Sequence, residues 1–437
     1  MLAYKKYQNK NIAIYGMGRT GISVAKTLQM FGANLFCWDD KKNIRKKIKK
    51  NFKLNKFWLN KSIINKIVIS PGIDINQSKI KKYLKKNTKK IITDLDLFFE
   101  GNKSSVIIAI TGTNGKSTTC KIIEKILKTA KYKVITGGNI GNPILSFNKT
   151  KKKCVFILEL SSYQLQYSNL IRSKHAAILN ISPDHLERHK SMKSYIKAKL
   201  KIFLAQEKTD YSYLSLDNKY SKFIKDTLRI KKIKSNLTII KKNDCKNILK
   251  KINNKYLESN GNKKNIAFAY QIAKNLKIRD GVIIKALNNF KGLPHRQELI
   301  FSNKKIECVN DSKATSFDAS LQSLLSYNKI YWILGGMPKL KDNFNLRNVN
   351  KKIVKAYIIG KSTNFFSKKI GKEVNYTISH NLKNAIKSVI RDINQDKENI
   401  KKKYTILFSP AAASFDQFKD FENRGEYFKN LVLKNFS

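Results

Sequence analysis

Arginine and acidic side chains are scarce in this 437-residue chain. Only ten of its 89 basic residues are arginine, and 30 acidic residues leave a formal net charge of +59. Proteins that read base edges favour arginine, because its guanidinium group binds guanine bidentately. The lysines are spread over the whole chain rather than gathered in one segment. We therefore expect lysine-rich solvated surfaces and weak, charge-driven binding of polyanions, with no specific nucleic-acid partner.

The chain also lacks paired cysteines and long apolar runs. No early stretch resembles a signal peptide, and no apolar run has the length of a membrane span. The five cysteines show no spacing typical of a disulfide framework or a metal site: Cys37, Cys120, Cys154, Cys245 and Cys308. These absences favour a cytoplasmic protein with reduced thiols and no membrane insertion. The chain length predicts roughly two to four domains.

The most informative segment is 110–118, which reads ITGTNGKST. It follows an apolar run at 106–110 that predicts a buried strand, and it precedes 119–130, whose apolar spacing predicts a helix. A glycine-rich turn in this position offers main-chain N–H groups and a helix N-terminus to phosphate. Lys116 would then reach the outer phosphates, and the Ser117 hydroxyl would reach Mg²⁺. Because Ile110 stands where the usual pattern has glycine, this is a shortened P-loop.

Residues 11–40 predict a strand, a glycine-rich turn, a helix and a second strand. The turn contains Gly16, Gly18 and Gly21, and Asp39 follows near the distance at which an acidic residue meets a ribose. Alone, this pattern favours NAD. The glycines report a pyrophosphate at a helix N-terminus, and UDP carries one as well. Either ligand fits the pattern.

Two polar side chains follow apolar strands predicted at 155–160 and 176–181. Glu159 and His185 each come near the end of one of these strands, and alternating strands and helices predict a mainly parallel sheet. Both side chains should therefore lie at the same rim as Ser117. Glu159 is a natural Mg²⁺ ligand, whereas His185 fits a ligand and a hydrogen-bonding histidine equally well. Strands predicted at 331–334, 356–359 and 404–408 indicate another Rossmann-like domain, whereas 205–260 is weakly periodic and uninformative.

The TGTNGKST segment resembles the ATP site of the Mur ligases and the related folylpolyglutamate synthetases. Further segments occur in the order seen in the Mur ligases, and together the similarity runs from Gly16 to Phe428. They are GGNIG (137–141), ELSSYQL (159–165), DHLERH (184–189), LPHR (293–296), NDSKAT (310–315), SPAAASFDQF (409–418) and FENRG (421–425). The last two resemble the branch of the family that adds D-glutamate.

The resemblance implies a three-domain α/β protein that works as a monomer. Residues 1–95 would form a Rossmann-like domain for the UDP substrate, 96–293 a central ATP-binding domain with a P-loop and a parallel sheet, and 294–437 a Rossmann-like domain for the amino acid. The implied reaction is ATP-dependent amide ligation in peptidoglycan precursor synthesis. The carboxylate of UDP-N-acetylmuramoyl-L-alanine becomes an acyl phosphate, which the amine of D-glutamate attacks.

The resemblance also implies the residues of the site. The ATP set is Gly112, Thr113, Asn114, Gly115, Lys116, Ser117, Thr118, Asn262, Asn265, Arg296 and Asp311. The UDP-substrate set is Gly18, Arg19, Thr20, Asp39, Ser70, Asn139 and Ser161. The D-glutamate set is Lys313, Thr315, Lys339, Ser414 and Phe421. Two Mg²⁺ ions would be held by Ser117, Glu159, His185 and Lys199, the last as a carbamate, and the catalytic set is Lys116, Asn139, His185 and Lys199.

Three rival functions follow from the same sequence. The first is another amino-acid-adding ligase, such as a folylpolyglutamate synthetase, but that function would not explain the dinucleotide-like first domain. A lysine-rich nucleic-acid-binding ATPase would need clustered arginine or interleaved aromatics. An NAD-dependent dehydrogenase would leave the P-loop unexplained. The sequence departs from the family pattern at Gly261, Glu187 and Met337-Pro338.

Overall fold

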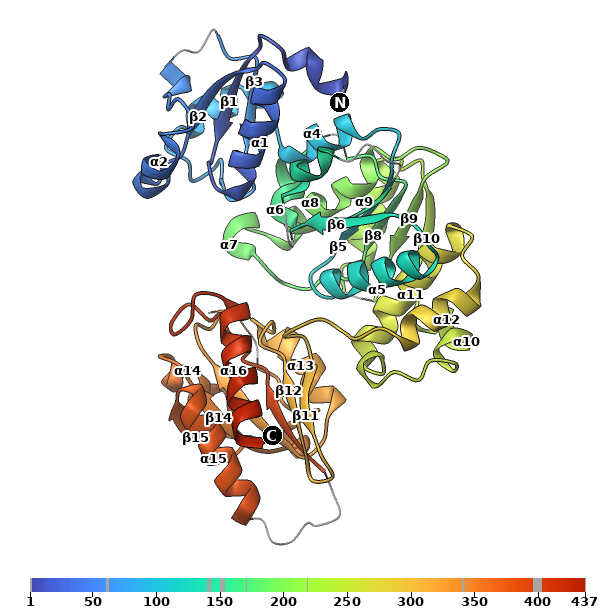
Figure 1. The fold of residues 1–437 in the computed structure, drawn as a ribbon, viewed down its shortest axis with the longest axis vertical. Helices are drawn as coiled ribbons and strands as arrows, with labels where there is room; N and C mark the ends of the chain where they lie inside the picture. The colour runs from blue at the N-terminus through green and yellow to red at the C-terminus, as the bar shows by residue number, and fades with distance from the viewer. Residues whose placement is uncertain are drawn as a thin grey trace. The chain divides into compact units, whose positions relative to one another are not determined.

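Three sheets, each flanked by helices, make up the protein in this computed structural model (Figure 1). The structure describes residues 2–59, 63–139, 143–149, 154–169, 171–217, 219–339, 342, 344–395 and 403–436. The strand orders are β2-β1-β3-β4, β10-β9-β8-β5-β7-β6 and β11-β12-β16-β13-β14-β15. The first two sheets are parallel, and the third is parallel apart from the antiparallel β11–β12 pair. The predicted three-domain α/β fold is confirmed.

The first sheet and its helices come from the N-terminal quarter of the chain. Its strands are β1 (Asn11–Tyr15), β2 (Asn34–Trp38), β3 (Lys66–Ile69) and β4 (Ile91–Ile92). The helices are α1 (Arg19–Met30), α2 (Lys42–Ile48), α3 (Lys81–Lys86) and α4 (Asp94–Gly101).

The second sheet carries the P-loop. Its strands are β5 (Val106–Thr111), β6 (Val134–Gly138), β7 (Val155–Glu159), β8 (His175–Ile178), β9 (Tyr211–Leu214) and β10 (Asn236–Ile239). The helices are α5 (Lys116–Thr129), α6 (Ser162–Tyr167), α7 (Leu186–His189), α8 (Met192–Leu204), α9 (Ser221–Ile230), α10 (Lys246–Leu249), α11 (Asn260–Asn275) and α12 (Asp280–Asn288). Because β5 lies between β7 and β8 and is covered on both faces, its sequence is a continuous apolar run.

The third sheet has a buried core on each face. Its strands are β11 (Glu298–Ser302), β12 (Ile306–Asn310), β13 (Ile330–Gly335), β14 (Ile353–Ile359), β15 (Tyr376–His380) and β16 (Tyr404–Phe408). The helices are α13 (Phe317–Ser326), α14 (Thr363–Ile370), α15 (Leu382–Gln395) and α16 (Phe421–Phe436). Along β13, Trp332 and Leu334 belong to one core while Tyr331 and Ile333 belong to the other, as the two-residue period of a strand requires.

The chain divides into two compact units. The first is Met1–Ile252 with Lys264–Asn288, which contains the first two sheets, and the second is Asn253–Lys263 with Asn289–Ser437. Each sheet lies inside one of the three predicted domain ranges, and the boundaries at 95 and 293 stay predictions. Helix α11 begins in the second unit and continues in the first.

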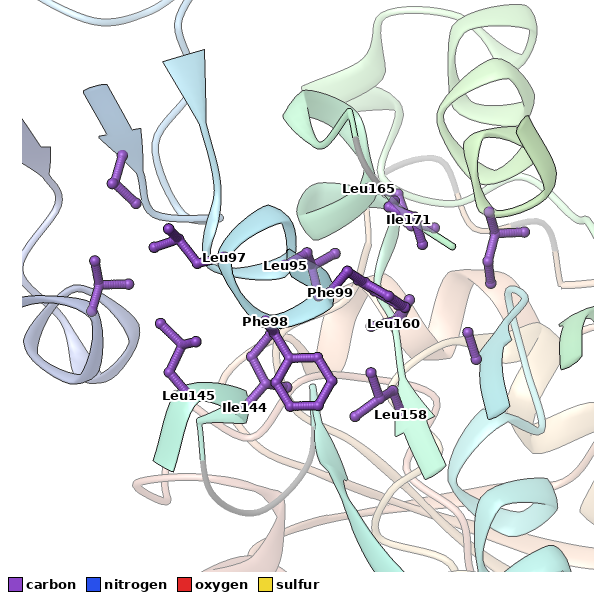
Figure 2. Close-up of a cluster of buried hydrophobic side chains, with 14 of the residues drawn as sticks. Leu95, Leu97, Phe98, Phe99, Ile144, Leu145, Leu158, Leu160, Leu165 and Ile171 are labelled. Carbon is purple, nitrogen blue, oxygen red and sulfur yellow. The ribbon is translucent and has the colours of Figure 1, made fainter. Parts of the chain in front are cut away.

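Helix α4 joins the cores of the first two sheets. It begins at a capping box in which Thr93 and Asp96 exchange hydrogen bonds, and this fixes the direction in which the helix leaves β4. Figure 2 shows Phe98 of α4 beside Ile144. The same buried core includes Leu28 of α1 and Leu158 of β7. Burial of each such side chain stabilises the folded state by about 1.5–3 kcal/mol relative to leaving it exposed. Within the described ranges, no helix is long and apolar enough to cross a membrane.

Candidate active site

The turn between β5 and α5 has the geometry of a phosphate-binding loop. Gly112 and Gly115 have positive φ values of 155° and 83°, and a Cβ at Gly115 would lie 2.5 Å from Oδ1 of Asn265. The Asn114 N–H donates to Oδ1 of Asn180 at 2.8 Å, and the Asn180 amide donates to the Asn114 carbonyl at 2.9 Å. These bonds fix the turn at the N-terminus of α5, where main-chain N–H groups bind anions.

Two lysine side chains meet at this turn. Nζ of Lys116 donates to the carbonyls of Gly112 and Thr113, at 3.0 and 2.8 Å. Nζ of Lys199, from α8, donates to the same Gly112 carbonyl at 2.8 Å and to Oγ1 of Thr111 at 3.4 Å. Lys199 is 1% exposed, and burial together with the charge of Lys116 holds its pKa well below the usual value. The structure thus brings both predicted catalytic lysines to the P-loop.

Ser117, Glu159 and Asn139 form a second cluster at the same sheet edge. Oγ of Ser117 donates to Oε2 of Glu159 at 2.5 Å, and the Asn139 amide donates to Oε1 at 3.0 Å. The Asn139 N–H also donates to the Glu159 carbonyl at 2.8 Å, beside Gly138, where a Cβ would lie 2.3 Å from that oxygen. Ile140 and Gly141, the end of the predicted 137–141 block, lie outside the described residues.

The donor set of this cluster fits a hard cation. Ser117 Oγ and the Glu159 carboxylate are adjacent oxygen ligands, which Mg²⁺ prefers, and both residues are buried. In the described part of the chain, no three His, Cys, Asp or Glu side chains gather as a metal cluster. Mg²⁺ needs fewer, since it often uses one or two carboxylates with phosphate and water. The residues therefore fit one Mg²⁺, and the second ion stays a prediction.

His185 belongs to a separate group of side chains, together with Tyr163 and Asp184. It caps α7 with a left-handed φ of 54°, and its Nδ1 lies 3.1 Å from the Tyr163 hydroxyl. Its Nε2 lies 3.3 Å from Oδ2 of Asp184, and its side chain is 41% exposed. The Asp184 carboxylate acts electrostatically on Lys199, partly offsetting the lowering of its pKa. His185 thus stands next to a carboxylate that faces the lysine pair.

In the first sheet, Asp39 supports the glycine-rich turn. One carboxylate oxygen accepts from the N–H of Met17 at 2.7 Å, and the other from the N–H of Lys41 at 2.9 Å. Oγ of Ser70 donates to the Gly16 carbonyl at 2.5 Å. Asp39 is 6% exposed, and its carboxylate stabilises the turn through these hydrogen bonds. This differs from the open ribose acceptor that a dinucleotide pattern indicates.

The remaining UDP-set residues flank these turns. Gly18 is the N-cap of α1, which begins at Arg19; both are exposed, and Thr20 is half-buried. Ser161 is the N-cap of α6, where its hydroxyl accepts from the N–H of Gln164 at 3.3 Å. Ser161 therefore has a structural task whether or not it binds substrate.

Asn262 and Asn265 lie in the two parts of α11 and are both buried. The Asn262 amide donates to the carbonyl of Tyr256 at 2.6 Å, within the second unit. Asn265 contacts the P-loop glycine in the first unit, as described above. Its place beside Gly115 agrees with a position near the nucleotide.

Asp311 is a buried carboxylate at the end of β12. Its Oδ2 accepts from the hydroxyls of Ser323 and Ser409, at 2.6 and 2.9 Å, and its Oδ1 accepts from the Gln297 N–H at 3.3 Å. Burial raises the pKa of Asp311 to about 6, although these bonds and the nearby Arg296 charge oppose the rise. Its oxygens are occupied by the protein's own donors.

The predicted amino-acid residues gather around Arg424 in the second unit. Nζ of Lys313 lies 3.5 Å from the centre of the Phe421 ring. Nε of Arg424 donates to the Ser312 hydroxyl at 3.1 Å, and Nη2 donates to the carbonyls of Ser312 and Ala412 at 2.9 and 3.0 Å. Arg424 therefore binds together the segments that carry Lys313, Phe421 and Ser414.

The turn after β13 joins the same group. Met337 and Ala413 exchange main-chain hydrogen bonds of 2.8 and 2.9 Å, which brings the segment of Lys339 beside that of Ser414. Lys339 is exposed, Thr315 is half-buried and Ser414 is buried. Positive and hydroxyl donors of this kind suit carboxylates.

Sequence reasoning did not identify Asn180, Tyr195 and Arg424 as site residues. Asn180 follows β8 and holds the P-loop, and the Tyr195 hydroxyl lies 3.0 Å from Oγ1 of Thr113 in that loop. Arg424 lies in the 421–425 block, which carried a family signal but no role. The polar residue that ends an apolar strand was a usable signal for Asn180, as it was for Glu159.

Two family models match the chain: "Mur ligase middle domain" over residues 110–281 and "Mur ligase MurD-like, N-terminal domain" over residues 10–92. A UDP-N-acetylmuramoylalanine–D-glutamate ligase of Rickettsia felis is 37% identical over 98% of both chains. One of Rickettsia bellii is 36% identical over 97% of this chain and 98% of its own. The crystal structure of MurF ligase from Thermotoga maritima in complex with ADP has a TM-score of 0.58 at 15% identity, covering 99% of this chain and 97% of that one. The last match shows a shared fold.

Proposed function

This chain belongs to the Mur ligase family, and on that premise we propose that it joins D-glutamate to UDP-N-acetylmuramoyl-L-alanine at the expense of ATP, in peptidoglycan precursor synthesis. The near full-length identity to the rickettsial D-glutamate ligases carries the proposal. The use of ATP and a UDP-linked substrate suits a cytoplasmic enzyme, and we propose that it acts as a monomer.

The P-loop supports the first chemical step. A carboxylate oxygen of UDP-N-acetylmuramoyl-L-alanine attacks the γ-phosphorus of ATP, and ADP leaves as the acyl phosphate forms. The N–H groups at the start of α5 and the ammonium of Lys116, whose Nζ bonds carbonyls of the same loop, would stabilise the phosphate charge. Asn180 keeps the loop in this conformation before ATP binds, so little reorganisation is needed.

Ser117 and Glu159 would hold Mg²⁺ beside this loop, and the bound ion would supply neutralisation of phosphate charge. Asn139 orients the Glu159 carboxylate by occupying its second oxygen. His185 is proposed as a ligand of a second ion, next to Asp184.

Lys199 is proposed to be carbamylated. A neutral amine attacks CO₂, a C–N bond forms, and the amine releases one proton, which leaves a carbamate with anionic oxygens. The lowered pKa of Lys199 favours the neutral amine that this reaction needs. The product would place an anionic group beside Lys116 in the position of a buried amine.

The second step is attack by the D-glutamate amine on the acyl-phosphate carbon, followed by release of phosphate. Lys313, Thr315, Lys339 and Ser414 are proposed to bind the two D-glutamate carboxylates, leaving the amine free. The main-chain N–H of Phe421, at the start of α16, would be a further donor. In the first sheet, the turn braced by Asp39 is proposed to hold the UDP diphosphate at the start of α1.

The decisive experiment is ADP release with a panel of L- and D-amino acids and two acceptors, UDP-N-acetylmuramoyl-L-alanine and a folate. We expect release to require the UDP substrate and D-glutamate together, with L-glutamate poor. Equal or faster turnover with the folate and L-glutamate would replace this proposal with a folylpolyglutamate synthetase activity.

A further inference from the structure

A cavity of about 490 Å³ lies beside the outer strands of the second sheet, away from the P-loop strand. It is formed by β9, β10, α9 and the turn that connects α9 to β10, all in the weakly periodic 205–260 region. Its apolar lining consists of Leu214, Leu216, Leu228, Ile233, Leu237 and Ile239. None of these residues belongs to the proposed ligase site.

The sheet register explains why these side chains form one surface. Ile239 pairs with Leu214 across the parallel β9–β10 ladder, so their side chains point to the same face. Leu237 stands two residues before Ile239 and therefore shares that face. Leu237 is 40% exposed, so the apolar lining remains accessible to water on the β10 side. An apolar hollow of this size lies within the range of small-molecule sites, roughly 300–1,000 Å³.

Three cationic side chains line the same cavity. Lys225 and Arg229 are four residues apart on α9 and so project from one side of the helix, and Lys232 follows the helix with a left-handed φ of 46°. Nearby Lys234 pairs with Glu207 at 3.3 Å, whereas these three form no ion pair with the residues that the structure describes. Their charges are therefore available to a ligand.

We propose that this cavity binds an amphipathic monocarboxylate, such as a medium-chain fatty acid. The aliphatic chain would cover the leucine and isoleucine lining, and the carboxylate would meet Lys225, Arg229 and Lys232. The guanidinium of Arg229 suits a carboxylate because it can donate two parallel hydrogen bonds. We favour a free carboxylate over a membrane surface because the apolar lining other than Leu237 is buried or half-buried and forms a hollow.

The cavity and the P-loop are distinct sites within the first unit. Strand β8, which pairs with β5 on one side and β9 on the other, separates the P-loop strand from the cavity strands. No residue is common to both sites. A carboxylate in the cavity should therefore bind together with ADP rather than compete with it.

The test is calorimetric titration of the full chain with octanoate, hexanoate and 1-octanol. Octanoate should bind more tightly than hexanoate, by about fourfold for each methylene, and 1-octanol should bind more weakly because it lacks the charge. The double variant Lys225→Glu/Arg229→Glu should weaken octanoate binding about tenfold or more. Leu237→Asp should also weaken it, and saturating ADP should leave it unchanged.

The matched control is Lys383→Glu/Lys387→Glu, the same charge change at the same spacing, at two exposed positions of α15. It should bind octanoate as the unmodified chain does, and thermal unfolding will verify that all variants are folded. Equal weakening in the control, equal binding of 1-octanol, or displacement by ADP or D-glutamate would each overturn the proposal.

Sedimentation with phosphatidylcholine–phosphatidylglycerol vesicles tests the rival ligand, a membrane surface, since Ile230 beside the cavity is 73% exposed. Vesicle binding that depends on Lys225 and Arg229, without octanoate binding, would show that these residues form a membrane-contact surface and not a fatty-acid site.

Discussion

Lys116 and Lys199 donate hydrogen bonds to one oxygen, the main-chain carbonyl of Gly112, at 3.0 and 2.8 Å. Two ammonium groups at such a distance repel each other, and water cannot screen a side chain as buried as Lys199. Burial disfavours the charged form of Lys199, and the Lys116 charge adds to this effect, so the pKa of Lys199 is lowered. A lowered pKa increases the fraction of neutral amine, the form that reacts with CO₂, and this supports the proposed carbamylation of Lys199.

Lys199→Ala should lose most ligase activity because the carbamate oxygens are absent. Acetate or propionate in the assay should restore part of it by supplying a carboxylate in the space left by the side chain. The measurement is ADP release with and without these acids, together with ¹³C NMR of the chain without substitutions in labelled bicarbonate.

Lys197→Ala is the control, since Lys197 is an exposed lysine on the same helix, and it should be fully active. An active Lys199→Ala variant together with the absence of a carbamate resonance would contradict the prediction.

Lys116→Ala should lower kcat by on the order of 100-fold or more, because it removes a preorganised positive charge from phosphoryl transfer. The thermal unfolding temperature should change little, since Lys116 is half-buried and its amine donates to the main-chain carbonyls of Gly112 and Thr113. Initial rates of ADP release at saturating substrates give kcat. A near-normal kcat in this variant would show that Lys116 does not take part in phosphoryl transfer.

Local sequence was sufficient for the parts of the site whose geometry is local. The strand, turn and helix around the P-loop were predicted because glycines, a buried run and a helical period adjoin each other at 106–130. The predicted strand 176–181 ends earlier, at Ile178, because Asn180 leaves the sheet to bond Asn114. That partner is distant in sequence, and no local pattern reveals it.

Tertiary contacts decided what the sequence did not show. Strand β15 was not predicted; it is an edge strand, and all of its side chains except Ser379 are exposed or half-buried. Arg424 resembles a solvated helix residue, yet the fold buries it, and its guanidinium donates to the carbonyls of Ser312 and Ala412. Asp39 was predicted by spacing alone, and only the fold reveals that main-chain N–H groups occupy both of its oxygens.

Asp94 should make stability depend on pH. It is buried at the start of α4, its Oδ1 has no partner in the described part of the chain, and burial, with a smaller effect of the Asp96 charge, raises its pKa to about 7. In the unfolded chain its pKa is about 3.9. The folded state thus retains a proton that the unfolded state loses, so this group's contribution to stability falls as pH rises from about 4 through 7, by on the order of 4 kcal/mol in total.

Asp94→Asn should therefore raise the free energy of unfolding at about pH 8 more than at about pH 5, as measured by urea denaturation. Glu373→Gln, at an exposed carboxylate, is the control and should show no such difference. A gain from Asp94→Asn that is the same at both pH values would show that Asp94 does not titrate with this sign.

Lys339 tests where the amino acid binds. Its segment lies beside Ser414 because Met337 and Ala413 pair through their main chains, and D-glutamate brings two carboxylates that need cationic or N–H donors. Removing one charged hydrogen bond of this kind costs roughly 2–5 kcal/mol. Lys339→Ala should therefore raise the KM for D-glutamate by about 30-fold or more while changing the KM for ATP little. Steady-state ADP release with each substrate varied in turn gives both constants, and Lys383→Ala, an exposed lysine of the same unit, should change neither. An equal rise in both KM values would assign Lys339 to the nucleotide, and no change in either would make it an ordinary surface lysine and move the D-glutamate site elsewhere.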